Sequence, residues 1–216
     1  MALEIEAKLR VASHEAVRQR LRQLNALFLG AVTEYNCIFD RPDGSLLAAG
    51  CGLRVRSALP LDDAQAADAG STPAPPLPAP LKREESGRAP AAVSKATLTF
   101  KGPVRAGAVK SREEIEIEVD DADTAARLLE RLGFVPVLTY EKRRESWEYG
   151  GCRIELDEPP RIGLFIEIEG PDEPSIRAVQ TALGLQSVPH EPASYVQLLT
   201  TYCDTQGITN RTLQLT

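Results

Sequence analysis

The chain has 216 residues, a formal net charge of −6 and 26% charged residues. That length fits one domain, alone or with a large insertion, and the acidic balance argues against a nucleic-acid binder, which would carry a basic stripe. Four scattered cysteines and two histidines form no zinc-ligand pattern, so we expect reduced thiols in a cytoplasmic protein. No apolar run approaches about 18 residues, and we expect neither a membrane span nor a secretion leader.

The predicted elements mix strands with amphipathic helices. A first strand covers residues 3–8, and Ser13 is placed to cap a helix near whose start His14 is expected to be solvated. Further strands are expected near 33–40, 52–57, 97–101, 112–119, 138–149, 152–157 and 163–169. Further helices are expected from a cap at Asp123 to Gly133, from Pro174 to Gly184 and from Ala193 to Tyr202. Trp147 and Tyr149 are expected to pack on the exterior under a helix.

Residues 58–95 differ from the rest in composition. They hold about ten Ala and seven Pro among small polar residues. Such a segment buries too little apolar surface to offset its ordering entropy, so we predict a flexible insertion. Its simplest interpretation is a loop without function, and the alternative is a partner-binding arm. We therefore expect a single domain over residues 1–203, interrupted at 58–95, with a tail at 204–216 that carries no clear signal.

Charged residues occupy one face of nearly every predicted strand. Glu4, Glu6 and Lys8 share a face because successive side chains of a strand point to opposite sides. Read in this way, the strands carry an acidic set and a basic set. The acidic set is Glu4, Glu6, Glu114, Glu116, Asp157, Glu167 and Glu169. The basic set is Lys8, Arg54, Arg56, Lys101, Arg112, Lys142 and Arg144.

An antiparallel sheet with one solvated face explains any single strand, but it does not explain why acids and bases gather separately. Burying them in a dry core is excluded, because each uncompensated ion costs several kcal/mol. We therefore predict an α+β fold in which a closed antiparallel barrel has helices packed on an apolar exterior and a hydrated, charged tunnel inside. The run 141–145 is charged on both faces, so alternation alone leaves Arg143 and Arg144 as alternatives.

The two sets of charges indicate a metal-dependent triphosphate site. Hard divalent cations take oxygen ligands, so clustered carboxylates without His or Cys favour Mg²⁺ or Mn²⁺. Arginine forks and lysine point charges suit a chain of phosphates. The expected partner is a small triphosphate substrate, and the residues by themselves do not select a reaction.

Several short motifs follow one another in a characteristic order. They are EIEAK at 4–8, LRVR at 53–56, TFKGP at 99–103, SREEIE at 111–116, LGFVPV at 132–137, EKRR at 141–144, LD at 156–157, GLFIEIE at 163–169 and SYVQLL at 194–199. The first matches the E-x-E-x-K signature, and the ordered set resembles the CYTH superfamily, also called triphosphate tunnel metalloenzymes. The forms at 99–103, 111–116 and 163–169 are most similar to its class IV adenylate cyclase branch.

The resemblance implies a closed eight-stranded antiparallel tunnel that takes a triphosphate with Mg²⁺ or Mn²⁺, and the cyclase branch suggests a homodimer. It implies metal binding by Glu4, Glu6, Glu116, Glu167 and Glu169, with Glu114 and Asp157 close by. It implies phosphate contacts from Lys8, Arg54, Arg56, Lys101, Arg112, Lys142 and Arg144, and so favours Arg144 over Arg143. The expected catalytic residues are Glu4, Glu6, Lys8, Arg56 and Lys101.

Two departures from the family pattern leave the reaction open. Cyclases of this class carry a His-Phe element shortly before E-x-E-x-K, where Met-Ala-Leu stands here, and Ala193 replaces a common Lys or Arg. The hypotheses are a cyclase that converts ATP to cyclic AMP and pyrophosphate, a triphosphatase for inorganic, thiamine or nucleoside triphosphate, and a non-catalytic polyphosphate or nucleotide binder. Tyr35, Phe39 and Tyr195 are aromatic candidates for the tunnel mouth.

Overall fold

The computed structural model describes residues 2–61, 95–104 and 110–215. Most of the insertion predicted at 58–95 falls on residues 62–94 and lies outside the described residues. Its two ends belong to strands, because β3 (Gly52–Pro60) and β4 (Lys95–Lys101) pair with each other along most of their length. The predicted boundaries of the insertion were therefore too wide at both ends.

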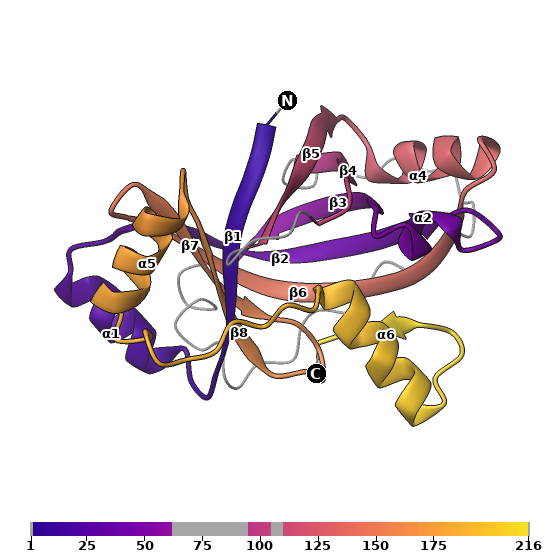
Figure 1. The fold of residues 1–216 in the computed structure, drawn as a ribbon. Coiled ribbons are helices and arrows are strands. Elements are labelled where there is room, and N and C mark those ends of the chain that lie inside the picture. The colour runs from indigo at the N-terminus through magenta and orange to yellow at the C-terminus, as the bar shows by residue number, and fades with distance from the viewer. Residues whose placement is uncertain (1, 62–94, 105–109, 216) are drawn as a thin grey trace.

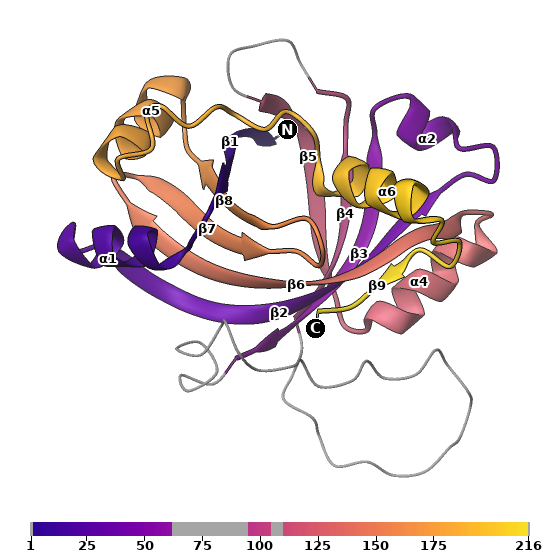
Figure 2. The same ribbon diagram turned by 90° about the horizontal axis from the view of Figure 1, so that it is seen from below.

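Eight antiparallel strands close into a barrel, which Figure 2 shows from below. Around the barrel the order is β2-β3-β4-β5-β1-β8-β7-β6, and β6 pairs back with β2. The other strands are β1 (Ala2–Val11), β2 (Leu27–Asp40), β5 (Lys110–Val119), β6 (Val135–Tyr149), β7 (Cys152–Glu158) and β8 (Leu164–Glu169). The predicted fold class, a closed eight-stranded antiparallel barrel with outer helices, is confirmed.

The five helices of the described residues lie outside the barrel (Figure 1). They are α1 (Glu15–Gln23), α2 (Ser45–Ala48), α4 (Ala122–Arg131), α5 (Glu173–Ala182) and α6 (Tyr195–Gln206). Helices α1 and α5 lie together at one end, and α2, α4 and α6 lie toward the other. None of them is long and apolar enough to cross a bilayer. Asp121, rather than the predicted Asp123, caps α4, because its carboxylate accepts a hydrogen bond from the backbone N–H of Thr124.

Most apolar side chains of the strands point outward, where the helices cover many of them, but Ile115 and Ile117 of β5 stay 53% exposed. Beneath α1 and α5, the fully buried Leu9 and Ile154 pack with Trp147, which confirms the predicted exterior position of Trp147. Beneath α4, Phe39 packs with Leu129, so Phe39 is not at the tunnel mouth as the sequence suggested. Because the apolar faces are outside, the inward faces of the strands are left to polar side chains.

The C-terminal tail is part of the fold. Helix α6 extends to Gln206, and a ninth strand, β9 (Thr212–Leu213), pairs in parallel with β6. Leu213 is buried against the core beneath α6, and the backbone N–H of Leu215 donates a hydrogen bond of 2.9 Å to Glu141. Only two residues form the strand, too short a run for an alternating pattern to show in the sequence.

His14 is buried, although the sequence suggested a solvated position. Its Nε2 lies 2.9 Å from the carbonyl oxygen of Phe165, and Nε2 must donate because a carbonyl oxygen only accepts. Burial lowers the pKa of His14 from its ordinary value of 6.5, and the nearby Arg18 lowers it further. The folded protein therefore favours a neutral imidazole.

We expect His14 to lower the free energy of unfolding as the pH falls. As the pH drops below the ordinary pKa, the unfolded chain binds a proton at His14 before the folded chain does, so unfolding becomes more favourable. Glutamine keeps a donor for Phe165 without titrating. H14Q should therefore lose less unfolding free energy than the wild type between about pH 7.5 and about pH 5.5 in urea titrations. Equal losses in H14Q and wild type would contradict the prediction.

Candidate functional site

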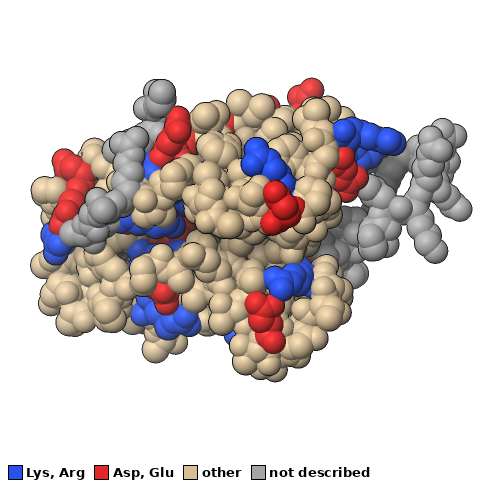
Figure 3. Space-filling model, turned by 45° about the vertical axis from the view of Figure 1, so that its right-hand side comes forward, with Lys and Arg blue, Asp and Glu red and all other residues tan. Residues whose placement is uncertain are grey.

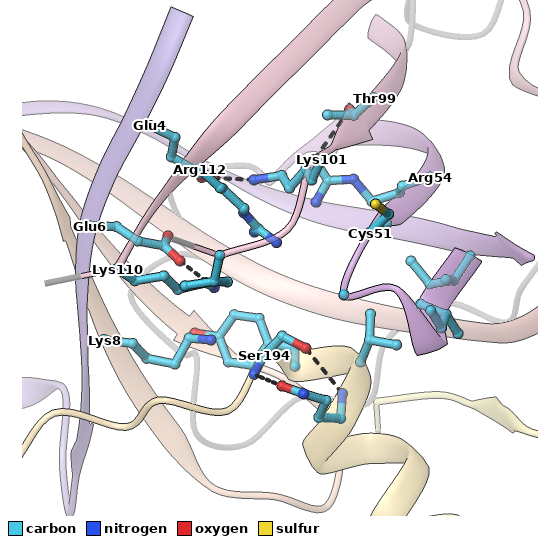
Figure 4. Close-up of a pocket in the computed structure, with 18 of the residues that line it drawn as sticks. Glu4, Glu6, Lys8, Cys51, Arg54, Thr99, Lys101, Lys110, Arg112 and Ser194 are labelled. Atoms are coloured by element: carbon cyan, nitrogen blue, oxygen red, sulfur yellow. Dashed lines mark hydrogen bonds and ion pairs between the residues drawn. The ribbon is translucent and has the colours of Figure 1, made fainter. Parts of the chain in front are cut away.

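Inward-pointing charged side chains from every strand of the barrel except β2 were the basis of the predicted tunnel, and most of them line one cavity of about 840 Å³. The predicted residues on its wall are Glu4, Glu6, Lys8, Arg54, Arg56, Lys101, Arg112, Lys142, Arg144, Glu167 and Glu169. Figure 4 shows the three β1 residues pointing into the cavity, Glu4 and Glu6 toward Lys101, Lys110 and Arg112 and Lys8 toward the side where Ser194 lies. In Figure 3, blue and red atoms sit together in a hollow of a largely tan surface.

At the acidic end of the cavity, carboxylates of β1 are paired with cations of β4 and β5. Glu4 accepts hydrogen bonds from Lys101 at 2.7 Å and from Arg112 at 3.0 Å, one on each oxygen. Glu6 accepts one from Lys110 at 2.6 Å. Each β1 carboxylate is thus neutralised by the protein's own cations, which a divalent ion would have to displace.

Glu114 and Glu116 of β5 do not reach the cavity wall. Glu114 lies 2.9 Å from the ammonium of Lys101, and Glu116 accepts a hydrogen bond of 2.7 Å from the hydroxyl of Thr99. The guanidinium of Arg54 is 3.7 Å from Glu116. Both carboxylates therefore contact the side chains that line the cavity rather than the cavity itself.

Glu169 of β8 shows how closely the carboxylates approach one another. It stands opposite Glu6 in the pairing of β1 with β8. Its pKa is raised by burial and by the negative charges of Glu4, Glu114 and Glu6. Mutual repulsion of this kind is what an oxygen-liganded divalent cation relieves, so the donor chemistry fits Mg²⁺ or Mn²⁺. Among the described residues, however, no three carboxylates already converge as a preformed metal site.

At the basic end of the cavity, Lys142 and Arg144 of β6 form ion pairs with a fully buried carboxylate, Asp157 of β7. Arg144 donates to both of its oxygens, at 2.7 and 2.5 Å, and Lys142 donates at 3.0 Å. The hydroxyl of Tyr195 donates a fourth hydrogen bond of 2.9 Å. Asp157 is absent from the cavity wall, so this structure places it as the anchor of the phosphate-binding candidates rather than among the exposed acids.

Lys8 is held where several elements meet. Its ammonium donates to the carbonyl oxygen of Ala193 at 3.1 Å, lies 3.4 Å from Glu167 and sits 4.0 Å above the ring of Tyr195. Glu167 also accepts a hydrogen bond of 2.7 Å from Arg144. Burial raises the pKa of Glu167, but the charges of Lys8 and Arg144 outweigh it and hold that pKa well below its usual range. Although position 193 lacks a cationic side chain, its backbone thus contributes to the site.

The ambiguity between Arg143 and Arg144 is resolved by register. Arg144 faces the cavity, whereas Arg143 lies 3.3 Å from the carboxylate of Glu158. Of the aromatic candidates, Tyr195 lines the cavity and Tyr35 does not. Of the three predicted aromatic candidates, only Tyr195 therefore borders the cavity.

Three charged residues of the site were missed by the sequence analysis. Lys110 and Glu155 line the cavity, and Glu34 of β2 is buried behind it. Alternation along β2 could have revealed Glu34, because Glu34, Asn36 and Ile38 share the inward face. Glu155 belongs to the same inward face of β7 as Asp157, and Lys110 precedes the motif at 111–116 by one residue.

One side of the cavity is not charged. Leu47 and Ala48 of α2 and Val196 and Thr200 of α6 form part of the wall, with Cys51 between α2 and β3. This wall joins the charged one without a partition, since all these residues border a single space. The cavity can therefore hold a molecule with a polyanionic part and a less polar part.

The CYTH domain model matches residues 2–195. The chain belongs to the CYTH family. A candidate adenylate cyclase from Methanocaldococcus jannaschii is 33% identical over 72 residues, which are 33% of this chain and 41% of that relative. The matched region thus spans about two fifths of the curated relative.

Several solved structures share the fold at low identity. A candidate adenylate cyclase from Vibrio parahaemolyticus is 20% identical with a TM-score of 0.68, over 92% of this chain and 98% of that one. A Pyrococcus horikoshii protein is 24% identical with a TM-score of 0.68, over 92% and 99%. A candidate adenylyl cyclase from Hippeastrum, described as having a dominant triphosphatase activity, is 21% identical with a TM-score of 0.62, over 92% and 96%. The roles assigned to single residues and the identity of the metal stay predictions.

Proposed function

We propose that this CYTH protein is a metal-dependent enzyme for triphosphates, with adenylate cyclase-like conversion of ATP to cyclic AMP and pyrophosphate as the first candidate. The observation that carries the proposal is the single cavity in which the acidic end, the basic end and the uncharged wall meet. Inorganic triphosphate would use only the charged part. A nucleoside triphosphate would use both, with its phosphates on the cations and its nucleoside toward α2 and α6.

The residues fit a polyanion and its counter-ions. Arg54, Arg56, Lys142 and Arg144 present guanidinium and ammonium groups that can bind phosphate oxygens. Glu4, Glu6 and Glu169, with Glu167 nearby, would hold Mg²⁺ or Mn²⁺, which supplies charge stabilisation and activation of the attacking oxygen when bound. Lys101 and Arg112 now neutralise Glu4, and they would be released toward the phosphates once that carboxylate takes a metal.

In the cyclase reaction, the 3′-oxygen of the ribose attacks the α-phosphorus, its proton is lost, and pyrophosphate leaves. The cations of β3 and β6 stabilise the negative charge that grows on the leaving group, because they are already oriented by buried carboxylates before substrate enters. The position of the sugar decides the outcome, since the attacking hydroxyl must lie in line with the departing pyrophosphate.

A triphosphatase is the second candidate, and two observations favour it. The Hippeastrum relative of similar fold is described as mainly a triphosphatase, and Ala193 removes a side-chain cation common in relatives. In this reaction water attacks the γ-phosphorus, orthophosphate is formed and a diphosphate leaves. The same cations would bind the phosphate oxygens and stabilise the leaving diphosphate, with the phosphate chain shifted along the cavity.

The deciding experiment is product analysis of the purified full chain with ATP, and separately with inorganic triphosphate, in Mg²⁺ or Mn²⁺. Cyclic AMP with pyrophosphate supports the cyclase. Orthophosphate without cyclic AMP supports the triphosphatase. Tight binding without any product would overturn both and leave a non-catalytic binder.

The uncharged wall provides a separate prediction. Replacing Thr200 of α6 by tryptophan fills the space beside Val196, so KM for ATP should rise by about tenfold or more if the nucleoside lies there. Turnover or binding of inorganic triphosphate should change by less than about threefold, because that ligand does not reach α6. The control is Q206W, an exposed position at the end of α6. Equal effects of T200W on both substrates would place the nucleoside elsewhere.

A further inference from the structure

Glu34 of β2 is a buried carboxylate behind the basic end of the cavity. Only 2% of it is exposed, and it does not line the cavity. Its Oε1 lies 2.9 Å from Nη1 of Arg56 and 3.7 Å from Nε of Arg144, and its Oε2 lies 3.2 Å from Nζ of Lys142. Those three cations all line the cavity, so Glu34 contacts the phosphate-binding candidates without itself bordering the cavity.

The charge of Glu34 is retained in the folded protein. Burial raises its pKa, but Lys142, Arg56 and Arg144 outweigh the burial and hold that pKa far below its usual range. The carboxylate is also incompletely satisfied, because Oε2 accepts no hydrogen bond of good geometry from the described residues. An anion in this position attracts three cations from two strands, Arg56 of β3 and Lys142 and Arg144 of β6.

The contacts of Glu34 also decide which donors are left for a ligand. In Arg56, Nη1 faces Glu34 and Nε donates to the side-chain oxygen of Asn36 at 3.2 Å. Its Nη2 has no partner among the described residues and is available to a phosphate oxygen. Lys142 and Arg144 each contact both Glu34 and Asp157, so two buried carboxylates restrain the position of each cationic head.

The stability of the fold alone gives little reason for a buried, charged carboxylate at position 34. Replacing a buried ion pair by apolar residues is often neutral or stabilising, because desolvation of the charges offsets their attraction. A buried anion that neutralises three cations has a second effect. It reduces the positive potential that a phosphate chain meets, and ground-state binding that is too strong slows turnover and product release.

We propose that Glu34 is a positioning residue that orients Arg56, Lys142 and Arg144 and limits how tightly they hold a phosphate chain. The inference rests on the proposed triphosphate function. It assigns to β2, which carries none of the predicted charged site residues, control over the strength of phosphate binding. Removing the charge of Glu34 should therefore tighten the binding of phosphate chains while it slows the reaction.

The test measures the Kd of inorganic triphosphate and of pyrophosphate by calorimetry without metal, and kcat and KM with metal. E34Q keeps the shape of the side chain and removes its charge, so both Kd values should fall on the order of tenfold. Both kcat and KM should fall as well, which is the signature of a ground state held too tightly. E34D keeps the charge but withdraws the carboxylate by one methylene, so its Kd values should lie between those of the wild type and of E34Q.

A matched control separates this role from ordinary support of the fold. Glu145 is a buried carboxylate on the outer face of β6, where Arg18 of α1 donates to both of its oxygens. E145Q should lower the melting temperature without changing either Kd. If E34Q does not fold, E34D provides the test, because its Kd values should fall in the same direction by a smaller factor.

The outcomes distinguish the two proposals. Failure of the wild type to bind triphosphate or pyrophosphate would overturn the proposed function, and the role of Glu34 with it. Normal binding by the wild type with an unchanged or weaker Kd in the folded Glu34 variants would overturn only the role of Glu34. A tighter Kd in the order wild type, E34D, E34Q supports it.

Discussion

Replacing Arg144 by methionine should lower the free energy of unfolding by about 3–5 kcal/mol and remove triphosphate binding. The cause is the fully buried Asp157, which receives two hydrogen bonds from Arg144 and would keep only those from Lys142 and Tyr195. Arg144 also bonds Glu167 at 2.7 Å. Loss of this guanidinium therefore leaves buried negative charge without compensation as well as one phosphate contact fewer.

Urea unfolding and calorimetric binding of inorganic triphosphate measure the two effects separately. The double variant R144M/D157N removes both charges, so it should recover part of the lost stability but none of the binding. R143M is the neighbouring control, since Arg143 faces Glu158 outside the cavity. Equal losses of stability in the single and double variants would show that an uncompensated Asp157 is not the cause.

Substituting Glu6 by glutamine should lower turnover by roughly 10²–10³-fold in the presence of Mg²⁺ or Mn²⁺, a loss of the size seen when a preorganised charge is removed from an active site. Glu6 stands opposite Glu169, and the charges of Glu4, Glu114 and Glu6 raise the pKa of Glu169. Removing one carboxylate from this group weakens its attraction for a divalent cation. E169Q should have a similar effect.

Direct measurement of Mn²⁺ binding provides a readout other than turnover. E6Q and E169Q should both bind Mn²⁺ more weakly than the wild type. E118Q is the matched control, because Glu118 follows the same alternation along β5 but is exposed and does not line the cavity. Full turnover and unchanged Mn²⁺ binding in both E6Q and E169Q would show that the acidic end of the cavity does not hold the metal.

The alternation of residues along the strands was informative because, in every strand of a barrel, alternate side chains face the interior and the exterior. The inward residues of β1, β3, β4 and β8 could be read from the chain because apolar residues alternate there with charged or polar ones. The rule was not applied to β2, where Glu34 and Asn36 are separated by a tyrosine, and Glu34 was missed. It was also insufficient in the run 141–145, where charges on both faces hide the register until β6 pairs with β2 and β7.

Burial was the property least accessible to the sequence. His14 was expected to be solvated because it stands near a helix start, but the chain returns at Phe165 to cover it and accept its hydrogen bond. Asp157 was grouped with the exposed acids because it shares their face of the sheet. Only the packing of β6 and α6 against it placed both its oxygens under Lys142, Arg144 and Tyr195.

By itself, the sequence determined the barrel, its inverted polarity and the two sets of charges, because these follow from local alternation and from the cost of burying ions without partners. Tertiary structure decided which charges face the cavity and which lie behind it, as with Glu34 and Asp157. It also decided that an uncharged wall from α2 and α6 borders the same space. These properties depend on contacts between residues far apart in the chain, and alternation within one strand carries no information about which strand or helix packs opposite.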